Sequence, residues 1–274
     1  MSSAPSGPAT PGEESLAGTI VSHNSYVLLH SRVPPTEFPG KVPSRLQRTL
    51  QLHASQWGGV VNFSWSPDQA VHSSTRDAEW EYDQETYRLT AFSRFQGLLE
   101  IPEVSSSNLE EVQERLRVHG SPADAAHPAS GDPADPNRIH IYVCTHRKRD
   151  CRCGDSGVPV YEAFRSEVAK RQLESRVRVG TVGHVGGHKW AANMLVFPSG
   201  DWLGNLRDHH VPQVLDAILA QHEEYADYVH APPLVPHNWR GRMGLSKDQQ
   251  LSLLAGHAAG SRDLPLRPLE RGDQ

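Results

Sequence analysis

The same succession of predicted elements occurs twice along the chain, and this repetition limits the possible folds. In the first half, hydrophobic periodicity predicts strands over 25–29, 60–65, 87–92 and 98–101, and helices over 44–57 and from 108. In the second half it predicts strands over 139–143, 177–182, 194–197 and 202–206, and helices over 160–173 and 211–222. A β-α-β unit followed by a hairpin and a closing helix is the thioredoxin-like order. We therefore expect an α/β chain of two tandem thioredoxin-like domains, with mixed β-sheets and flanking helices.

Small and polar residues separate the two halves. Between 120 and 137 the chain consists mainly of Pro, Ala, Asp, Ser and Gly, a composition typical of a linker. The predicted domains therefore span 19–119 and 138–229. Residues 1–18, rich in Ser, Pro, Ala and Gly, predict a disordered tail. Residues 230–274 predict a C-terminal tail, with a short helix over 246–254 capped by Ser246.

Composition excludes several classes of protein. A net charge of -5 and a pI near 6.3 argue against a nucleic-acid binder, which usually carries a basic face. No apolar run is long enough to span a bilayer, so no membrane association is expected. Three cysteines packed side by side do not resemble a secreted disulfide framework, and the N-terminus lacks the features of a secretion signal. We expect a cytoplasmic or mitochondrial protein that is not secreted.

All three cysteines and a glycine-flanked histidine pair form the chemically most informative pattern. Cys144 ends the predicted strand over 139–143, Cys153 ends the loop that follows, and His184 and His188 come directly after the strand over 177–182. In a β-α-β unit the loops leaving two neighbouring parallel strands lie side by side. The four residues could therefore converge. Two thiolates and two imidazoles are the ligand set of structural zinc or of a Rieske-like iron-sulfur centre.

Two alternatives remain open at this point. Sixteen histidines make a chance pair common, and free cysteines are often buried structural residues, so the clusters are also compatible with a site that holds no metal. If a metal is bound, zinc is the default for two Cys and two His. The eight residues 145–152 between Cys144 and Cys153 exceed the spacing of zinc fingers and ribbons, which favours a larger cofactor.

The runs CTHRKRDCRCG (144–154) and GHVGGHKWAAN (183–193) resemble the sucrase/ferredoxin-like family, and the resemblance extends from about 25 to 245. It implies a thioredoxin-like ferredoxin with a 2Fe-2S cluster held by Cys144, Cys153, His184 and His188. Cys151 would then be a bystander, although the Cys-Arg-Cys spacing leaves open which of Cys151 and Cys153 is the ligand. Arg147 departs from the family pattern, in which a glycine is commoner.

This resemblance implies an electron carrier or redox sensor and not an enzyme. Imidazole ligands make a cluster less negative than thiolates do and raise its reduction potential. The cations Arg147, Lys148, Arg149 and Lys189 could dock an acidic reductase as redox partner, or could simply be solvated. Although the family name mentions sucrase, no spacing of acids identifies the carboxylate pair of a glycosidase.

A zinc-stabilised or cluster-free interaction module is the alternative to an electron carrier. In that reading, residues 239–242 (WRGR) are either a docking segment or a tail packed on its own domain.

Overall fold

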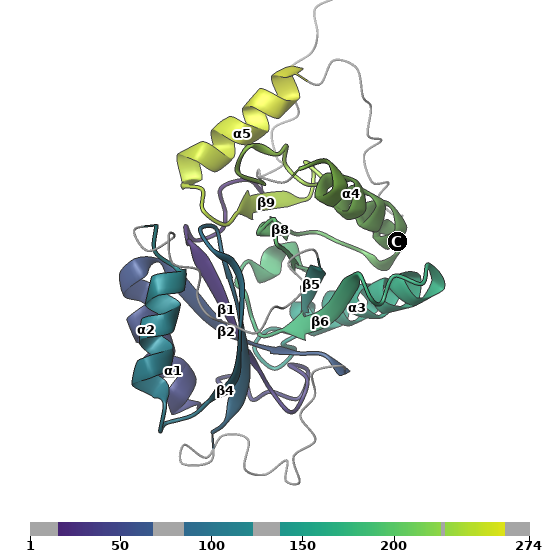
Figure 1. Cartoon of the computed structure of the whole chain (residues 1–274). Helices are drawn as coiled ribbons and strands as arrows, with labels where there is room; N and C mark the ends of the chain where they lie inside the picture. The colour runs from purple at the N-terminus through teal and green to yellow at the C-terminus, as the bar shows by residue number, and fades with distance from the viewer. Residues whose placement is uncertain (1–15, 68–84, 123–137, 226–227, 261–274) are drawn as a thin grey trace, which may run out of the picture.

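The computed structural model describes residues 16–67, 85–122, 138–225 and 228–260 (Figure 1). Most of the predicted N-terminal tail and of the linker over 120–137 lies outside the described residues. Within them, nine strands form one mixed sheet in the order β4-β3-β1-β2-β6-β5-β7-β8-β9, with helices flanking it. The predicted α/β class, mixed strand directions and flanking helices are confirmed.

The first half contains four strands and two helices in the predicted order. They are β1 (Ser25–His30), α1 (Arg45–Ala54), β2 (Gly59–Trp65), β3 (Tyr87–Ser93), β4 (Gly97–Val104) and α2 (Leu109–His119), and a 3-10 turn η1 (Ser55–Trp57) follows α1. Ser44 caps α1, because its hydroxyl accepts a hydrogen bond from the Gln47 N–H at 3.0 Å. The apolar faces of α1 and α2 cover one face of these strands, where Leu46, Leu50 and Leu116 are buried.

The second half repeats this order. It contains β5 (Ile139–Cys144), α3 (Cys151–Lys170), β6 (Val177–Val182), β7 (Met194–Phe197), β8 (Asp201–Leu203) and α4 (Val211–Glu224), with 3-10 turns η5 (His188–Trp190), η6 (Asp208–His210) and η7 (Tyr228–His230). Its strand order, β6-β5-β7-β8, is that of β2-β1-β3-β4 in the first half. In both halves the first two strands are parallel and the other two are antiparallel to their neighbours.

The prediction for helix 160–173 is wrong at its start, because α3 begins at Cys151. Pro159 and two glycines lie in this stretch, and such residues are uncommon inside a helix. Gly157, however, lies against β5, where a Cβ would come within 2.1 Å of the Cys144 carbonyl oxygen. The glycine therefore permits close helix-strand contact, and Cys151 and Cys153 lie in the first turn of a helix and not in a loop.

The two halves share one sheet. β2 and β6 pair antiparallel through Ser64–Val182 and Trp65–Thr181, so the edge strand of each half is covered by the other. Figure 1 shows α1 and α2 on one side of the strands and α3 and α4 on the other. The sheet is therefore continuous, and the division into two domains stays a prediction.

Helix-free faces of the two halves also pack together. Phe92 of β3 and Phe197 of β7 stack with ring centroids 4.0 Å apart and planes 3° apart. Tyr26 of β1 contacts Trp202 of β8 at 5.7 Å between centroids. Cys144 belongs to the same buried cluster, so it lies close to the contact between the halves.

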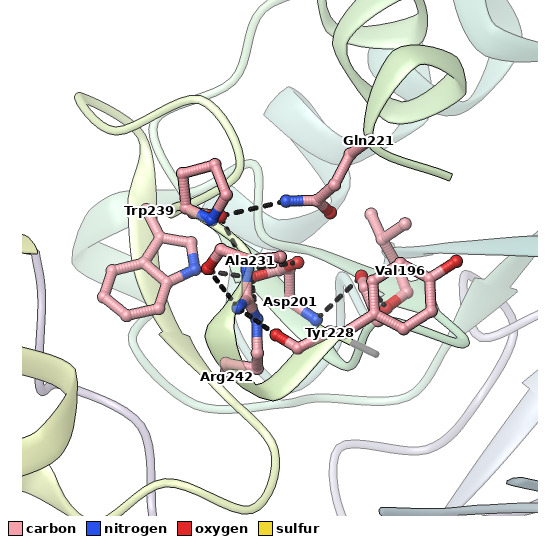
Figure 2. Close-up of polar contacts among 9 residues, drawn as sticks. Val196, Asp201, Gln221, Tyr228, Ala231, Trp239 and Arg242 are labelled. Carbon is pink, nitrogen blue, oxygen red and sulfur yellow. Dashed lines mark hydrogen bonds and ion pairs between the residues drawn. The ribbon is translucent and has the colours of Figure 1, made fainter. Parts of the chain in front are cut away.

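The C-terminal segment, predicted as a tail, adds a strand and a helix: β9 (Trp239–Arg242) extends the sheet beyond β8, and α5 (Lys247–Gly260) follows. Figure 2 shows how β9 is anchored: Asp201 accepts hydrogen bonds from Trp239 Nε1 at 2.6 Å and Arg242 Nε at 2.9 Å. Of the two alternatives for WRGR, a docking segment or a tail packed on its own domain, the structure favours the second, because the side chains of Trp239, Arg240 and Arg242 are buried.

No helix among the described residues combines the length and the apolar character that crossing a bilayer requires.

Candidate metal centre

Parallel pairing of β5 and β6 brings the predicted ligands to one end of the sheet. Cys144, the last residue of β5, is paired in register with Val182, the last residue of β6. His184 follows two residues later. The carboxyl ends of the two strands therefore lie next to each other, as expected for a β-α-β unit.

The first turn of α3 supplies the second cysteine. Asp150 caps this helix, since its carboxylate accepts a hydrogen bond from the Arg152 N–H at 3.1 Å. Cys153 is thereby placed with its sulfur 3.5 Å from Nδ1 of His184. The ligand atoms of Cys144, Cys153 and His184 all lie within 4.8 Å of one another, and both cysteines are buried. Three of the four predicted residues thus come together.

His188 lies beside this group of three. Its ring stacks on that of His184, with centroids 5.6 Å apart, and its side chain is 45% exposed. Its Nδ1 is 3.7 Å from an Asp150 carboxylate oxygen. Cys151 is exposed on the outer side of α3. The geometry thus favours Cys153 over Cys151, while ligation by these residues stays a prediction.

The two buried thiols are electrostatically unequal. The pKa of Cys144 is held well below its usual range, because its sulfur accepts hydrogen bonds from the Cys153 thiol, from His184, and from the backbone N–H groups of Val185 and His146. Donation to Cys144 and burial raise the pKa of Cys153. Cys144 is therefore the first of the two thiols to lose its proton, and metal binding would displace the proton from Cys153 as well. Two thiols and an imidazole with a second imidazole beside them are a donor set suited to zinc or an iron-sulfur cluster.

The backbone of the histidine loop, residues 183–193, is held by polar side chains. Asn62 of β2 donates from its amide to the carbonyls of Gly183 and His184, at 3.4 and 3.5 Å. Arg240 of β9 donates to the carbonyl of Gly186 at 3.2 Å, and Asn193 donates to that of Gly187 at 3.0 Å. Gly186 and Gly187 have φ of 80° and 68°, where a Cβ would be strained.

Sequence reasoning missed Asn62 and Arg240. The one signal for Asn62 in the sequence is a polar side chain inside an apolar strand, and Arg240 was part of the segment predicted as a tail.

The first half also covers residues 145–150, which connect Cys144 to α3. His146 donates from Nε2 to the carbonyl of Pro39 at 2.9 Å, and its ring meets Phe38 edge to face at 5.5 Å between centroids. A Cβ at Gly40 would come within 2.9 Å of the Lys148 carbonyl. Both halves therefore shape the site.

The predicted docking cations differ in their surroundings. Arg147 is paired with Asp155 at 2.8 Å, and Lys189 lies 4.4 Å from the centroid of the Trp190 ring. Lys148 and Arg149 are exposed in the turn before α3.

The sequence profile of the sucrase/ferredoxin-like family matches residues 16–241, which includes both runs that carry the predicted ligands. The chain belongs to the sucrase/ferredoxin-like family. The predicted resemblance is therefore confirmed. In this sucrase/ferredoxin-like chain, the match also includes Asn62 and Arg240, the two side chains that hold the histidine loop.

This sucrase/ferredoxin-like chain is similar to several fungal proteins. Altered inheritance of mitochondria protein 32 of Meyerozyma guilliermondii is 28% identical over 147 residues, 51% of this chain and 50% of that protein. The protein of the same name from Debaryomyces hansenii is 36% identical over 81 residues, 28% of this chain and 29% of that protein. Actin patches distal protein 1 of Saccharomyces cerevisiae is 29% identical over 98 residues, 31% of each chain. The chain thus spans half the length of these relatives or less.

A solved structure, that of a thioredoxin-like [2Fe-2S] ferredoxin from Aquifex aeolicus, matches with 18% identity and a TM-score of 0.29. The match covers 33% of this chain and 87% of the ferredoxin.

Proposed function

We propose that this chain holds a 2Fe-2S cluster through Cys144, Cys153, His184 and His188 and passes single electrons. The observation that carries the proposal is the convergence of two buried sulfurs and a ring nitrogen within 4.8 Å at the carboxyl ends of β5 and β6. Membership of a family named ferredoxin-like is consistent with it. When bound, the cluster would supply a one-electron acceptor.

The position of His188 favours a cluster over a single zinc ion. Zinc needs all four ligand atoms about 2.0–2.3 Å from one metal. A 2Fe-2S cluster distributes its four ligands over two irons. It therefore suits a donor set in which His188 lies beside the other three donors and not among them.

The residues around the site have separate roles in this proposal. Neutral imidazoles from His184 and His188 make the centre less negative than four thiolates would, which raises its reduction potential. The half-exposed ring of His188 is the point where the centre meets solvent. No residue is required to bind or transform a substrate, so the chain acts as a carrier or redox sensor and not as a catalyst.

We also propose an acidic redox partner. Lys148 and Arg149 are exposed in the turn between β5 and α3, beside the proposed centre. Positive charges in such a position increase the rate of encounter with a negatively charged protein. A reductase with an acidic face is the class that fits. Cytosol or mitochondrion is the proposed compartment, since buried free thiols fit a reducing environment.

The repeated strand order supports a further part of the proposal, that each half is a thioredoxin-like domain. In this view the first half supplies no ligand to the cluster. Its first strand, β1, ends in His30, whereas the corresponding strand of the second half, β5, ends in the proposed ligand Cys144.

Anaerobic purification followed by a visible spectrum and counts of iron, sulfide and zinc tests the proposed cofactor. We expect about two irons and two sulfides per chain and an electron paramagnetic resonance signal after reduction. One zinc per chain without iron would support the zinc-stabilised alternative. Protein that binds neither metal would contradict both.

A further inference from the structure

Arg240 is a buried cation beneath the histidine loop. Only 2% of the residue is exposed. Its guanidinium donates to the Gly186 carbonyl at 3.2 Å, to Asn193 Oδ1 at 2.8 Å, and to the hydroxyl and carbonyl of Thr19, each at 3.2 Å. It thus joins the loop that carries both histidines to the last strand of the sheet.

The charge of Arg240 is not balanced by a carboxylate in the part of the chain that the structure describes. All its hydrogen-bond partners are neutral, and its guanidinium lies 4.9 Å from the centroid of the Trp190 ring. Arg242 on the same strand, in contrast, is paired with Asp201. Burial lowers the pKa of Arg240 to about 10, so it stays charged at neutral pH.

The positive charge lies close to the proposed ligands. A Cβ on Gly187, the residue before His188, would come within 2.4 Å of the Arg240 guanidinium. A thiolate at Cys144 would favour the charged form of Arg240. An uncompensated cation in a buried site acts strongly on nearby charge, because water screens it poorly.

We propose that Arg240 raises the reduction potential of the centre and positions its histidine loop, an inference that rests on the proposed cluster. Two ferric irons, two sulfides, two thiolates and two neutral imidazoles sum to zero charge. One electron from an external donor, dithionite in the test below, reduces one iron and makes the centre singly negative. The fixed charge of Arg240 favours this reduced state over the oxidised one.

Redox titration of the purified chain with dithionite, followed by visible absorption, tests the inference. Arg240→Met should lower the ratio of reduced to oxidised centre at a given applied potential about tenfold, a shift of about 59 mV for one electron. Arg240→Lys, which keeps the charge but loses the planar fork, should restore most of the potential. The control is Arg178→Met. Arg178 is largely buried in the second half but is paired with Glu100. Its substitution should therefore change the ratio of reduced to oxidised centre by less than about twofold.

Several outcomes would overturn the inference while leaving the cluster in place. One is an Arg240→Met variant with full iron content and an unchanged potential, and another is a Lys variant shifted as far as the Met variant. If Arg240→Met does not fold, Asn193→Asp places a carboxylate against the guanidinium, and it too should lower the potential. An unchanged potential there would refute the role of charge. Wild-type protein without iron and sulfide would instead refute the proposed function itself.

Discussion

The side-chain amide of Asn62 lies 3.5 Å from the backbone carbonyl of His184, and this hydrogen bond crosses from the first half of the chain to the second. Asn62 also donates to Gly183 and to the Tyr26 hydroxyl, at 3.4 and 3.1 Å. The loop that carries His184 and His188 is thus supported by the first half, whose described residues supply none of the proposed ligands. The first half is therefore a working part of the site.

Replacing Asn62 by Ala should weaken this support. Loss of the hydrogen bonds should lower the free energy of unfolding by about 1 kcal/mol and speed iron release to a chelator several-fold. Gln47→Ala is the matched control, because the Gln47 amide donates to the Val61 carbonyl at 3.1 Å and not to the histidine loop. It should cost similar stability without changing iron release. Equal release rates in the two variants would show that Asn62 has no specific role.

The cysteines should divide into two classes. Cys144→Ser and Cys153→Ser should lose iron and visible colour, since their sulfurs converge with His184. Cys151→Ser should retain both, because Cys151 is exposed on the outside of α3. Iron and sulfide counts on the three variants check this. Colourless Cys151→Ser protein would assign the ligand role to Cys151 instead.

Gly157 sets the distance between the two ligand-bearing elements. A methyl group there would overlap the Cys144 carbonyl, so Gly157→Ala should push α3 away from β5 and cost about 1–3 kcal/mol. Iron content should fall with it, because Cys153 moves with the helix. Gly256→Ala in α5 is the control: nothing lies within 4 Å of its added Cβ, and it should be neutral or slightly stabilising in urea unfolding. Full iron content in Gly157→Ala would contradict the expected movement.

Buried histidines of the first half, among them His23 and His30, should make stability depend on pH. Burial lowers the pKa of His23 to about 4 and that of His30 to about 3, against about 6.5 in the unfolded chain. Below pH 6.5 the unfolded state binds protons that the folded state does not, so stability falls as the pH drops towards 4. At pH 5 the loss should be on the order of 1–2 kcal/mol per histidine.

Urea unfolding of wild type and His23→Gln at pH 7 and pH 5 tests this dependence. The loss between the two pH values should be smaller in the variant. His237→Gln, at an exposed position, should behave as wild type. An identical loss in all three proteins would exclude His23 as a source.

Much of the fold could be predicted because its strands are apolar and short, with clear turns between them. Every predicted strand and helix of the two halves is present, and β6 and β7 match their predicted bounds. Two elements were misjudged for local reasons. The first turns of α3 contain glycines and a proline that favour loops in isolation, and only contact with β5 explains them. β9 has two arginines among its four residues, and only burial against Asp201 makes it a strand.

The site was predictable only in part. Cys144, Cys153 and His184 were identified because thiols and imidazoles carry recognisable chemistry. Asn62 and Arg240 act through backbone carbonyls far away in the sequence, and a single sequence carries no record of such partners. The side position of His188 depends on the left-handed glycines before it, whose conformation the sequence permits without requiring it.

Thr19 and Arg240 are joined by backbone and side-chain hydrogen bonds, although 220 positions lie between them in the order of synthesis. A chain still growing on the ribosome therefore contains Cys144, Cys153, His184 and His188 before β9, which hydrogen-bonds to the histidine loop, has been synthesised. The support of the histidine loop by β9 is therefore complete only after residue 240 has been synthesised, and a polypeptide ending before that position would contain the proposed ligands without the strand that holds their loop.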